Sequence, residues 1–332
     1  MKPTFLAIIA AVALACGAST AMAQPEQIIP PAETHYNSGP QPINPGARNP
    51  GKRPPPAAVY GSEGIYTDSP WGIVSTRRTD PAFVGIMQGI QEAAKQATEK
   101  EINVAPMSKE ALDDQISDLT AHNAKSIIID APRPDDVARI IANAKFLKIN
   151  VVVVSEIAPQ GGLKGAPLIV TAPTEYAFAG ADAAIDALKD QGKGRIVFLA
   201  SGFWEDDLRQ KFLEQFTDKK QYEVIEAKED TPIAETGVPT VFVALTPADT
   251  SKIPPYMIDV SDAKVVGTGD TVGVKFLYDE GRINYLLRTD AARIFSECQR
   301  LVGNPVGEPV IVKPLVEKST KTPAPPGAPP MN

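Results

Sequence analysis

Two short runs of the sequence, Ser126–Asp130 (SIIID) and Asn150–Ser155 (NVVVVS), are apolar at every central position. A strand with one face in water alternates apolar and polar residues, so a continuous apolar run predicts a strand that is covered on both faces. Such strands belong to parallel sheets with helices packed on each side. The chain is therefore predicted to be an α/β protein in which strands alternate with covering helices.

Strand and helix patterns alternate between about residues 61 and 318, beginning with a strand at 71–76 and an amphipathic helix at 81–96. The alternation restarts after a strand at 168–171. Two doubly wound parallel sheets of about 100 residues each account for this better than one large sheet. Further strands are predicted at 102–105, 195–200, 222–227, 240–245, 264–267 and 283–287, and further helices at 109–122, 135–146, 175–189, 206–216, 273–280 and 290–302.

The first 23 residues predict export. One Lys precedes an apolar run, and an A-x-A cleavage site ends at Ala23. The run is shorter than the roughly 20 apolar residues that span a bilayer. We expect cleavage after Ala23 and a soluble protein in the periplasm; the alternative is lipoprotein processing at Cys16, where the lipobox Leu stands one position late.

Prolines gather at both ends of the chain. Ten of the 32 lie in residues 24–60, and the tail 319–332 is also rich in proline. Proline fixes φ and lacks the amide hydrogen, so both segments are predicted to be extended or disordered. They could dock a partner, or serve as a spacer and a frayed end.

Composition excludes several function classes. The formal charge is −7, from 33 Lys and Arg against 40 Asp and Glu, and no basic stripe suggests nucleic-acid binding. Two Cys and two His supply neither a Cys/His zinc site nor a histidine-based triad. His35 lies in the proline-rich segment, His122 ends a helix, and Cys298 is expected to be a buried apolar side chain. We expect no enzyme, metal or cofactor.

Four segments, in one order and spacing, resemble the ribose-binding type of periplasmic solute-binding protein. They are WGIVSTRRTDPAFVGIMQGIQEAAKQ, AKSIIIDAPRPDDVARIIANAKFLKINVVVVSE, YAFAGADAAIDALKDQGKGRIVFLASG and AKVVGTGDTVGVKFLYDEGRINYLL. The likeness covers about residues 71–316 and consists of many local matches. It implies the type I fold, in which two lobes close on a solute around a hinge of three crossovers. Lobe 1 would be 69–173 plus 289–311, and lobe 2 would be 174–288 plus 312–318.

The resemblance places the first ligand contacts in the loop after the first strand. Sugar-binding members supply an Asn and aromatic rings there; this chain is one residue longer and offers Arg77, Arg78 and Asp80, with Phe83 as the remaining ring. The arginines could hold an anion by bidentate hydrogen bonds, or form a solvated pair. Phe83 could stack on a ligand or lie in the core of the lobe.

Other positions depart from the sugar binders. Ser155 and Glu156 stand where those proteins carry an Asp-Arg pair that grips sugar hydroxyls, and Arg288 stands in place of a Gln near the last crossover. Thr246 begins the segment that replaces an Asn-Asp pair. The Pro-Pro pair that follows predicts that no helix forms there.

Three more residues complete the predicted site. Trp204 could stack on a ligand ring. Arg209 could point into the cleft or pair on the surface with an acidic residue one turn before it. Asp270 could accept a ligand hydroxyl or cap a helix. Apart from these contacts, Glu175 matches an acidic residue that opens lobe 2 in the family that the chain resembles.

The segment 229–239 is too short and too interrupted by Pro and Gly for the helix that should join two parallel strands. Either the connection is a bare loop or the strand order of the second sheet differs.

The sequence therefore predicts a monomeric, exported receptor that captures a small polar ligand, such as a sugar, a sugar acid or a related organic anion. Its arginines favour an anionic or mixed polar ligand, and its partner would be an ABC-type membrane permease or a sensor. The alternative is a binding-protein fold reused as a protein interaction module, with a vestigial cleft.

Overall fold

The structure is a computed structural model that describes residues 64–77, 80–106, 111–133, 137–159, 163–199, 205–227, 237–256, 260, 262–304 and 307–321. The predicted export signal, the proline-rich segment 24–60 and most of the tail lie outside the described residues. So do two of the predicted ligand contacts, Arg78 and Trp204.

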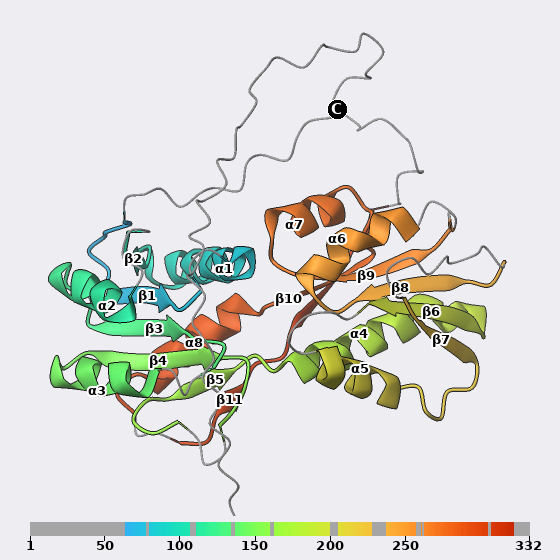
Figure 1. The fold of residues 1–332 in the computed structure, drawn as a ribbon. Coiled ribbons are helices and arrows are strands. Elements are labelled where there is room, and N and C mark those ends of the chain that lie inside the picture. Colours follow the sequence, from blue (N-terminus) through green and yellow to red (C-terminus); the bar gives the residue numbers. More distant parts are fainter. Residues whose placement is uncertain are drawn as a thin grey trace, which may run out of the picture. The chain divides into compact units, whose positions relative to one another are not determined.

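Two six-stranded sheets form the fold, with the strand orders β2-β1-β3-β4-β5-β11 and β7-β6-β8-β9-β10-β12 (Figure 1). All paired strands are parallel except β10 and β12. The predicted architecture of two doubly wound parallel sheets is confirmed. The strands are β1 Trp71–Ser75, β2 Asn103–Val104, β3 Ser126–Asp130, β4 Asn150–Ser155, β5 Leu168–Val170, β6 Gly194–Leu199, β7 Tyr222–Glu226, β8 Thr240–Ala244, β9 Lys264–Thr268, β10 Tyr285–Arg288, β11 Val310–Ile311 and β12 Leu315–Lys318.

Helices cover both faces of each sheet, as the apolar runs predict. In β3, Ile127 and Ile129 pack with α2 and α3, whereas Ile128 between them packs with α1 and α8 on the opposite face. In the second sheet α4 and α5 cover one face and α6 and α7 the other. The helices are α1 Pro81–Thr98, α2 Leu112–Ala121, α3 Ala138–Phe146, α4 Pro173–Leu188, α5 Glu205–Glu214, α6 Pro247–Tyr256, α7 Val272–Asp279 and α8 Ala291–Leu301, with a 3₁₀ turn at Lys189–Gln191.

The chain passes between the two sheets three times: after β5, after β10, and between β11 and β12. The alternative that the strand order of the second sheet differs is wrong, because β7 and β8 flank β6 on either side, just as β2 and β3 flank β1. Residues 228–236, which make most of the connection in question, lie outside the described part of the chain.

The prediction that no helix follows Thr246 is wrong, because α6 begins at the next residue. The Thr246 hydroxyl accepts a hydrogen bond from the backbone N–H of Asp249 (3.1 Å), and a proline at the first helical position sacrifices no hydrogen bond. Buried Thr250 and Ile253 fix the helix to the sheet. The Pro-Pro pair lies in the last turn, where α6 ends. Capping and tertiary packing thus outweigh the local cost of the prolines.

Candidate functional site

A cavity of about 160 Å³ lies at the carboxyl ends of strands from both sheets. Open α/β sheets bind their ligands at this position. Its walls come from the residues that follow β1, β4, β5, β8, β9 and β10 and from helices α1, α4 and α5. The lining residues are Arg77, Ile86, Glu156, Thr171, Pro173, Tyr176, Leu208, Leu245, Thr246, Pro247, Thr268, Gly269, Asp270 and Thr289.

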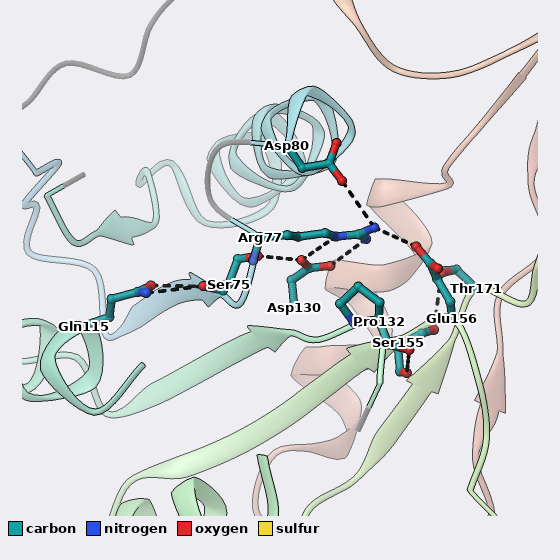
Figure 2. Close-up of polar contacts among 9 residues, drawn as sticks. All are labelled: Ser75, Arg77, Asp80, Gln115, Asp130, Pro132, Ser155, Glu156 and Thr171. Atoms are coloured by element: carbon teal, nitrogen blue, oxygen red, sulfur yellow. Dashed lines mark hydrogen bonds and ion pairs between the residues drawn. The ribbon is translucent and has the colours of Figure 1, made fainter. Parts of the chain in front are cut away.

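The Arg77 guanidinium is held by carboxylates from three segments (Figure 2). Its Nε and Nη2 donate to the two oxygens of Asp130, at 2.9 and 3.1 Å. Its Nη1 donates to Glu156 Oε1 at 2.6 Å and lies 3.8 Å from Asp80 Oδ2. Bidentate pairing of this kind fixes the plane of the guanidinium. The three carboxylates therefore hold Arg77 in one orientation at the edge of the cavity.

A second layer of contacts supports this ion network. The Ser75 hydroxyl donates to Asp130 Oδ2 (2.7 Å) and accepts from the backbone N–H of Arg77 (2.9 Å). The buried Gln115 side chain bonds the backbone of Ser75 in both directions, at 3.3 Å each. Loop and network are thus anchored to α2 and to the ends of β1 and β3.

Electrostatics favour the charged form of Arg77. Burial by itself disfavours the cation, but the hydrogen bonds and charges of Asp130 and Glu156 outweigh burial and raise the pKa of Arg77 above its ordinary value. Among the described residues, the Arg77 guanidinium faces three carboxylates, so Arg77 already has its counter-ions.

The opposite wall is built around Asp270. Its Oδ1 accepts from Arg288 Nε (2.9 Å) and its Oδ2 from the backbone N–H of Thr289 (3.0 Å). Arg288 also donates to Glu317 Oε1 of β12 (3.0 Å). The Tyr176 hydroxyl lies 3.0 Å from Thr289 Oγ1, and burial raises the pKa of Tyr176 above its ordinary value. Asp270 is therefore tied to the crossover that follows β10.

The structure brings four of the predicted ligand contacts to the cavity: Arg77, Glu156, Thr246 and Asp270. Three other predicted contacts lie next to the cavity without lining it. Asp80 and Arg288 pair with lining residues, and buried Ser155 donates to the carbonyl of Pro132 at 2.8 Å. The role of each as a ligand contact stays a prediction.

Two predicted contacts lie elsewhere among the described residues. Phe83 packs in the core with α8, which was the alternative for this ring. Arg209 is about half exposed and donates to Glu226 Oε2 on β7 at 2.9 Å. It forms a surface ion pair, as in the alternative, but with a neighbouring strand instead of its own helix. Glu175 lies 3.7 Å from the Lys313 ammonium and does not line the cavity.

Sequence reasoning missed Asp130 and Tyr176. Asp130 is the only ionisable residue of β3 and lies at its carboxyl end, where ligand contacts are expected. The position of Asp130 at the end of the strand could have identified it as a candidate site residue. Tyr176 follows Glu175 in the first turn of α4, and nothing in the sequence distinguishes it from a core aromatic residue.

A second hollow, of about 820 Å³, adjoins the cavity and shares Glu156 and Pro173 with it. Its wall is mainly apolar, and Asp207 and Glu308 supply its other carboxylates. Within the described part of the chain, no group of three or more His, Cys, Asp or Glu side chains could hold a metal ion. No helix in this part is long and apolar enough to cross a membrane.

Neither a protein-family model nor a curated protein matches the sequence. Solved structures do match. An arabinose-binding protein, AraP, from Geobacillus stearothermophilus superposes with a TM-score of 0.55 at 15% identity, over 75% of this chain and 96% of that one. A periplasmic solute-binding protein from Actinobacillus succinogenes with bound D-allose gives 0.52 at 14% identity, over 75% and 96%. A LacI transcriptional regulator from a Rhodococcus species gives 0.50 at 16% identity, over 76% and 98%.

Proposed function

We propose that this chain, which has the fold of the type I periplasmic sugar-binding proteins, is an exported receptor for a small polar solute. The observation that supports this is the cavity at the carboxyl ends of both sets of strands, with polar side chains contributed from each sheet. The receptor would act in the periplasm and present its solute to an ABC-type permease or a sensor. Its fold neighbours are binding proteins and a transcriptional regulator, and we propose no catalytic role.

We propose a neutral polyhydroxylated ligand of the sugar class. The expectation of an anion rested on the arginines, but Arg77 is paired with Asp130 and Glu156, and Arg288 with Asp270 and Glu317. An anion would have to displace these carboxylates, and the described lining of the cavity has two carboxylates, Glu156 and Asp270, against one arginine, Arg77. A neutral hydroxyl can donate to a carboxylate oxygen without that cost.

The size of the cavity supports a receptor that opens to admit its ligand. Small-molecule sites usually enclose about 300–1,000 Å³, whereas this cavity has about 160 Å³. A sugar would enter only if the halves moved apart at the three crossovers and closed again around it. The apolar side chains Leu208 and Leu245 would then lie against the ring of the sugar.

A thermal-shift screen tests this proposal, with pentoses, hexoses, polyols, sugar acids and small organic anions as ligands. A ligand at 100 times its dissociation constant adds about 2.7 kcal/mol of stability. We expect neutral sugars to shift the melting temperature and anions to leave it unchanged.

Two matched variants locate the site by calorimetric titration with the best sugar of the screen. Glu156→Gln keeps the shape of a lining residue and should weaken binding at least tenfold. Arg209→Gln breaks a surface ion pair outside the cavity and should leave the affinity unchanged. Equal affinities in both variants would remove Glu156 from the site.

One observation favours the alternative of a protein interaction module with a vestigial cleft: Arg77, which lines the cavity, is already paired with the protein's own Asp130 and Glu156. This alternative predicts no shift with any compound of the screen. It also predicts an exported protein that co-purifies equally well with wild type and with the Glu156→Gln variant.

A further inference from the structure

Gly85 lies inside the 18-residue helix α1, where glycine is the least favourable residue after proline. A Cβ atom at this position would lie 2.7 Å from the Cβ of Asp270 and 2.8 Å from its carbonyl carbon, with the carbonyl oxygen closer still. These separations are far below ordinary van der Waals contact. Only a residue without a side chain fits between α1 and Asp270.

This contact joins the two halves of the protein. Helix α1 packs on the first sheet, in the core that contains Met87 and Ile90. Asp270 follows β9 of the second sheet. Gly85 and Asp270 are therefore a point at which the backbones of the two halves approach each other closely.

Neither side of the contact can easily yield. The Asp270 carboxylate is bound by Arg288 and by the backbone N–H of Thr289, which fixes its loop. On the other side, the main chain of α1 is held by its own helical hydrogen bonds. A side chain at position 85 would have to push α1 away from Asp270.

The contact also borders the candidate site. Ile86, the next residue of α1, and Asp270 both line the cavity of about 160 Å³. A change in the approach of α1 to Asp270 would therefore change the width of that cavity.

We propose that Gly85 determines how closely the two halves approach, so that the closed state depends on the absence of a side chain at this position. The inference rests on the proposed function in one respect, the hinge between the halves. The contact itself requires no ligand, and it can be tested without one.

The experiment measures the distance between the halves by pulsed EPR on ligand-free protein. Spin labels are attached at Lys95→Cys in α1 and Lys275→Cys in α7 of the chain without its predicted export signal, where Cys298 is the one other thiol and is buried. Gly85→Ala and Gly85→Leu should lengthen the distance by several ångströms, the Leu variant more than the Ala variant. Both residues favour helix, so circular dichroism should show unchanged helicity.

Two glycines provide matched controls. Gly273 in α7 has nothing within 4 Å of a built Cβ, so Gly273→Ala should leave the distance unchanged. A Cβ at Gly89 in α1 would meet Ala291 of α8, which packs on the same sheet, so Gly89→Ala disturbs packing within one half only.

An unchanged distance in Gly85→Leu would overturn the inference. This outcome is distinguishable from failure of the proposed function. If the protein binds a sugar but the distance between the spin labels is unchanged in Gly85→Leu, only the role of Gly85 is refuted. A chain that opens in Gly85→Leu but binds no compound of the screen refutes only the receptor.

Discussion

Arg77 and Asp130 are 53 residues apart in sequence, and they form a bidentate ion pair at the ends of the adjacent strands β1 and β3. Asp130 is almost wholly buried, and Arg77 keeps about a fifth of its side-chain surface. The pair fixes the loop after β1 to the sheet. The sequence suggests Arg77 as a cation that could bind a ligand. In the structure, its charge is instead balanced by carboxylates of the protein.

Asp130→Asn tests how much stability the pair supplies. The substitution removes a buried charge and leaves Arg77 with Glu156 alone at close range. Breaking a buried pair costs about 3–5 kcal/mol. Because Arg77 keeps its second partner and some solvent, we expect the free energy of unfolding to fall by about 2–3 kcal/mol. Urea denaturation measures this change.

Asp80→Asn is the control for that measurement. Asp80 lies 3.8 Å from the Arg77 guanidinium and is 40% exposed. Exposed pairs contribute about 0–1 kcal/mol, so the two variants should differ clearly. Equal losses of unfolding free energy in the two variants would show that the buried, bidentate Asp130 pair stabilises the protein no more than the exposed Asp80 contact does.

Thr250→Val tests the attachment of α6 to the sheet. The buried Thr250 hydroxyl accepts a hydrogen bond from the backbone N–H of Thr268 (2.8 Å) and donates one to the backbone carbonyl of Thr268 (2.9 Å). Valine keeps the shape and leaves the N–H without this partner, which costs about 1–3 kcal/mol. Thermal unfolding should show the loss. Ser251→Ala, which removes an exposed hydroxyl on the same helix, should change the melting temperature little.

The stability contributed by Asp186 should depend on pH. Its carboxylate accepts hydrogen bonds from the Tyr285 hydroxyl (2.5 Å), Lys189 and Lys318, which hold the pKa of Asp186 well below its ordinary value. A folded-state pKa below the unfolded one stabilises the protein above the unfolded pKa, near 3.9, and this contribution is lost as the pH falls.

Melting temperatures of wild type and Asp186→Asn measure this dependence. Their difference should be constant above about pH 5 and shrink below about pH 4. Asp182→Asn, at an exposed position on the same helix, serves as the control. A difference between wild type and Asp186→Asn that persists undiminished at pH 2–3 would contradict the assignment.

Cys298 should be chemically inert in the folded protein. It is buried in the core between α8 and the first sheet, and burial together with Glu297 raises the pKa of its thiol. A maleimide reagent at pH 8 should therefore modify Cys298 only after unfolding, with the modified peptide identified by mass spectrometry. Rapid modification of the native chain would mean that α8 opens readily.

Much of the fold could be predicted because burial on both faces leaves a direct trace in composition. The runs in β3 and β4 have no polar residue at their central positions, and both strands lie inside a covered sheet. The helix α6 could not be predicted in this way. It depends on a cap at Thr246 and on the burial of Thr250, and neither is visible in the local Pro-Pro pattern.

The candidate site was less predictable, because side chains can be placed near a cleft and still point elsewhere. The sequence places Phe83 and Arg209 close to strand ends. In the structure, the Phe83 ring packs in the core, and the Arg209 side chain pairs with Glu226 of β7. Arg77 does reach the cavity, yet its partner Asp130 comes from a strand that sequence reasoning treated only as core. Pairing across the sheet is a tertiary property.

The last strand of each sheet, β11 and β12, comes from the final stretch of the described chain. During synthesis, neither half can complete its sheet until residues 310–318 have left the ribosome, and the first half also waits for α8 to fill its core. With this chain order, neither sheet of the protein is complete during most of its translation. This late completion fits the export that we propose, because an exported chain crosses the membrane before it folds.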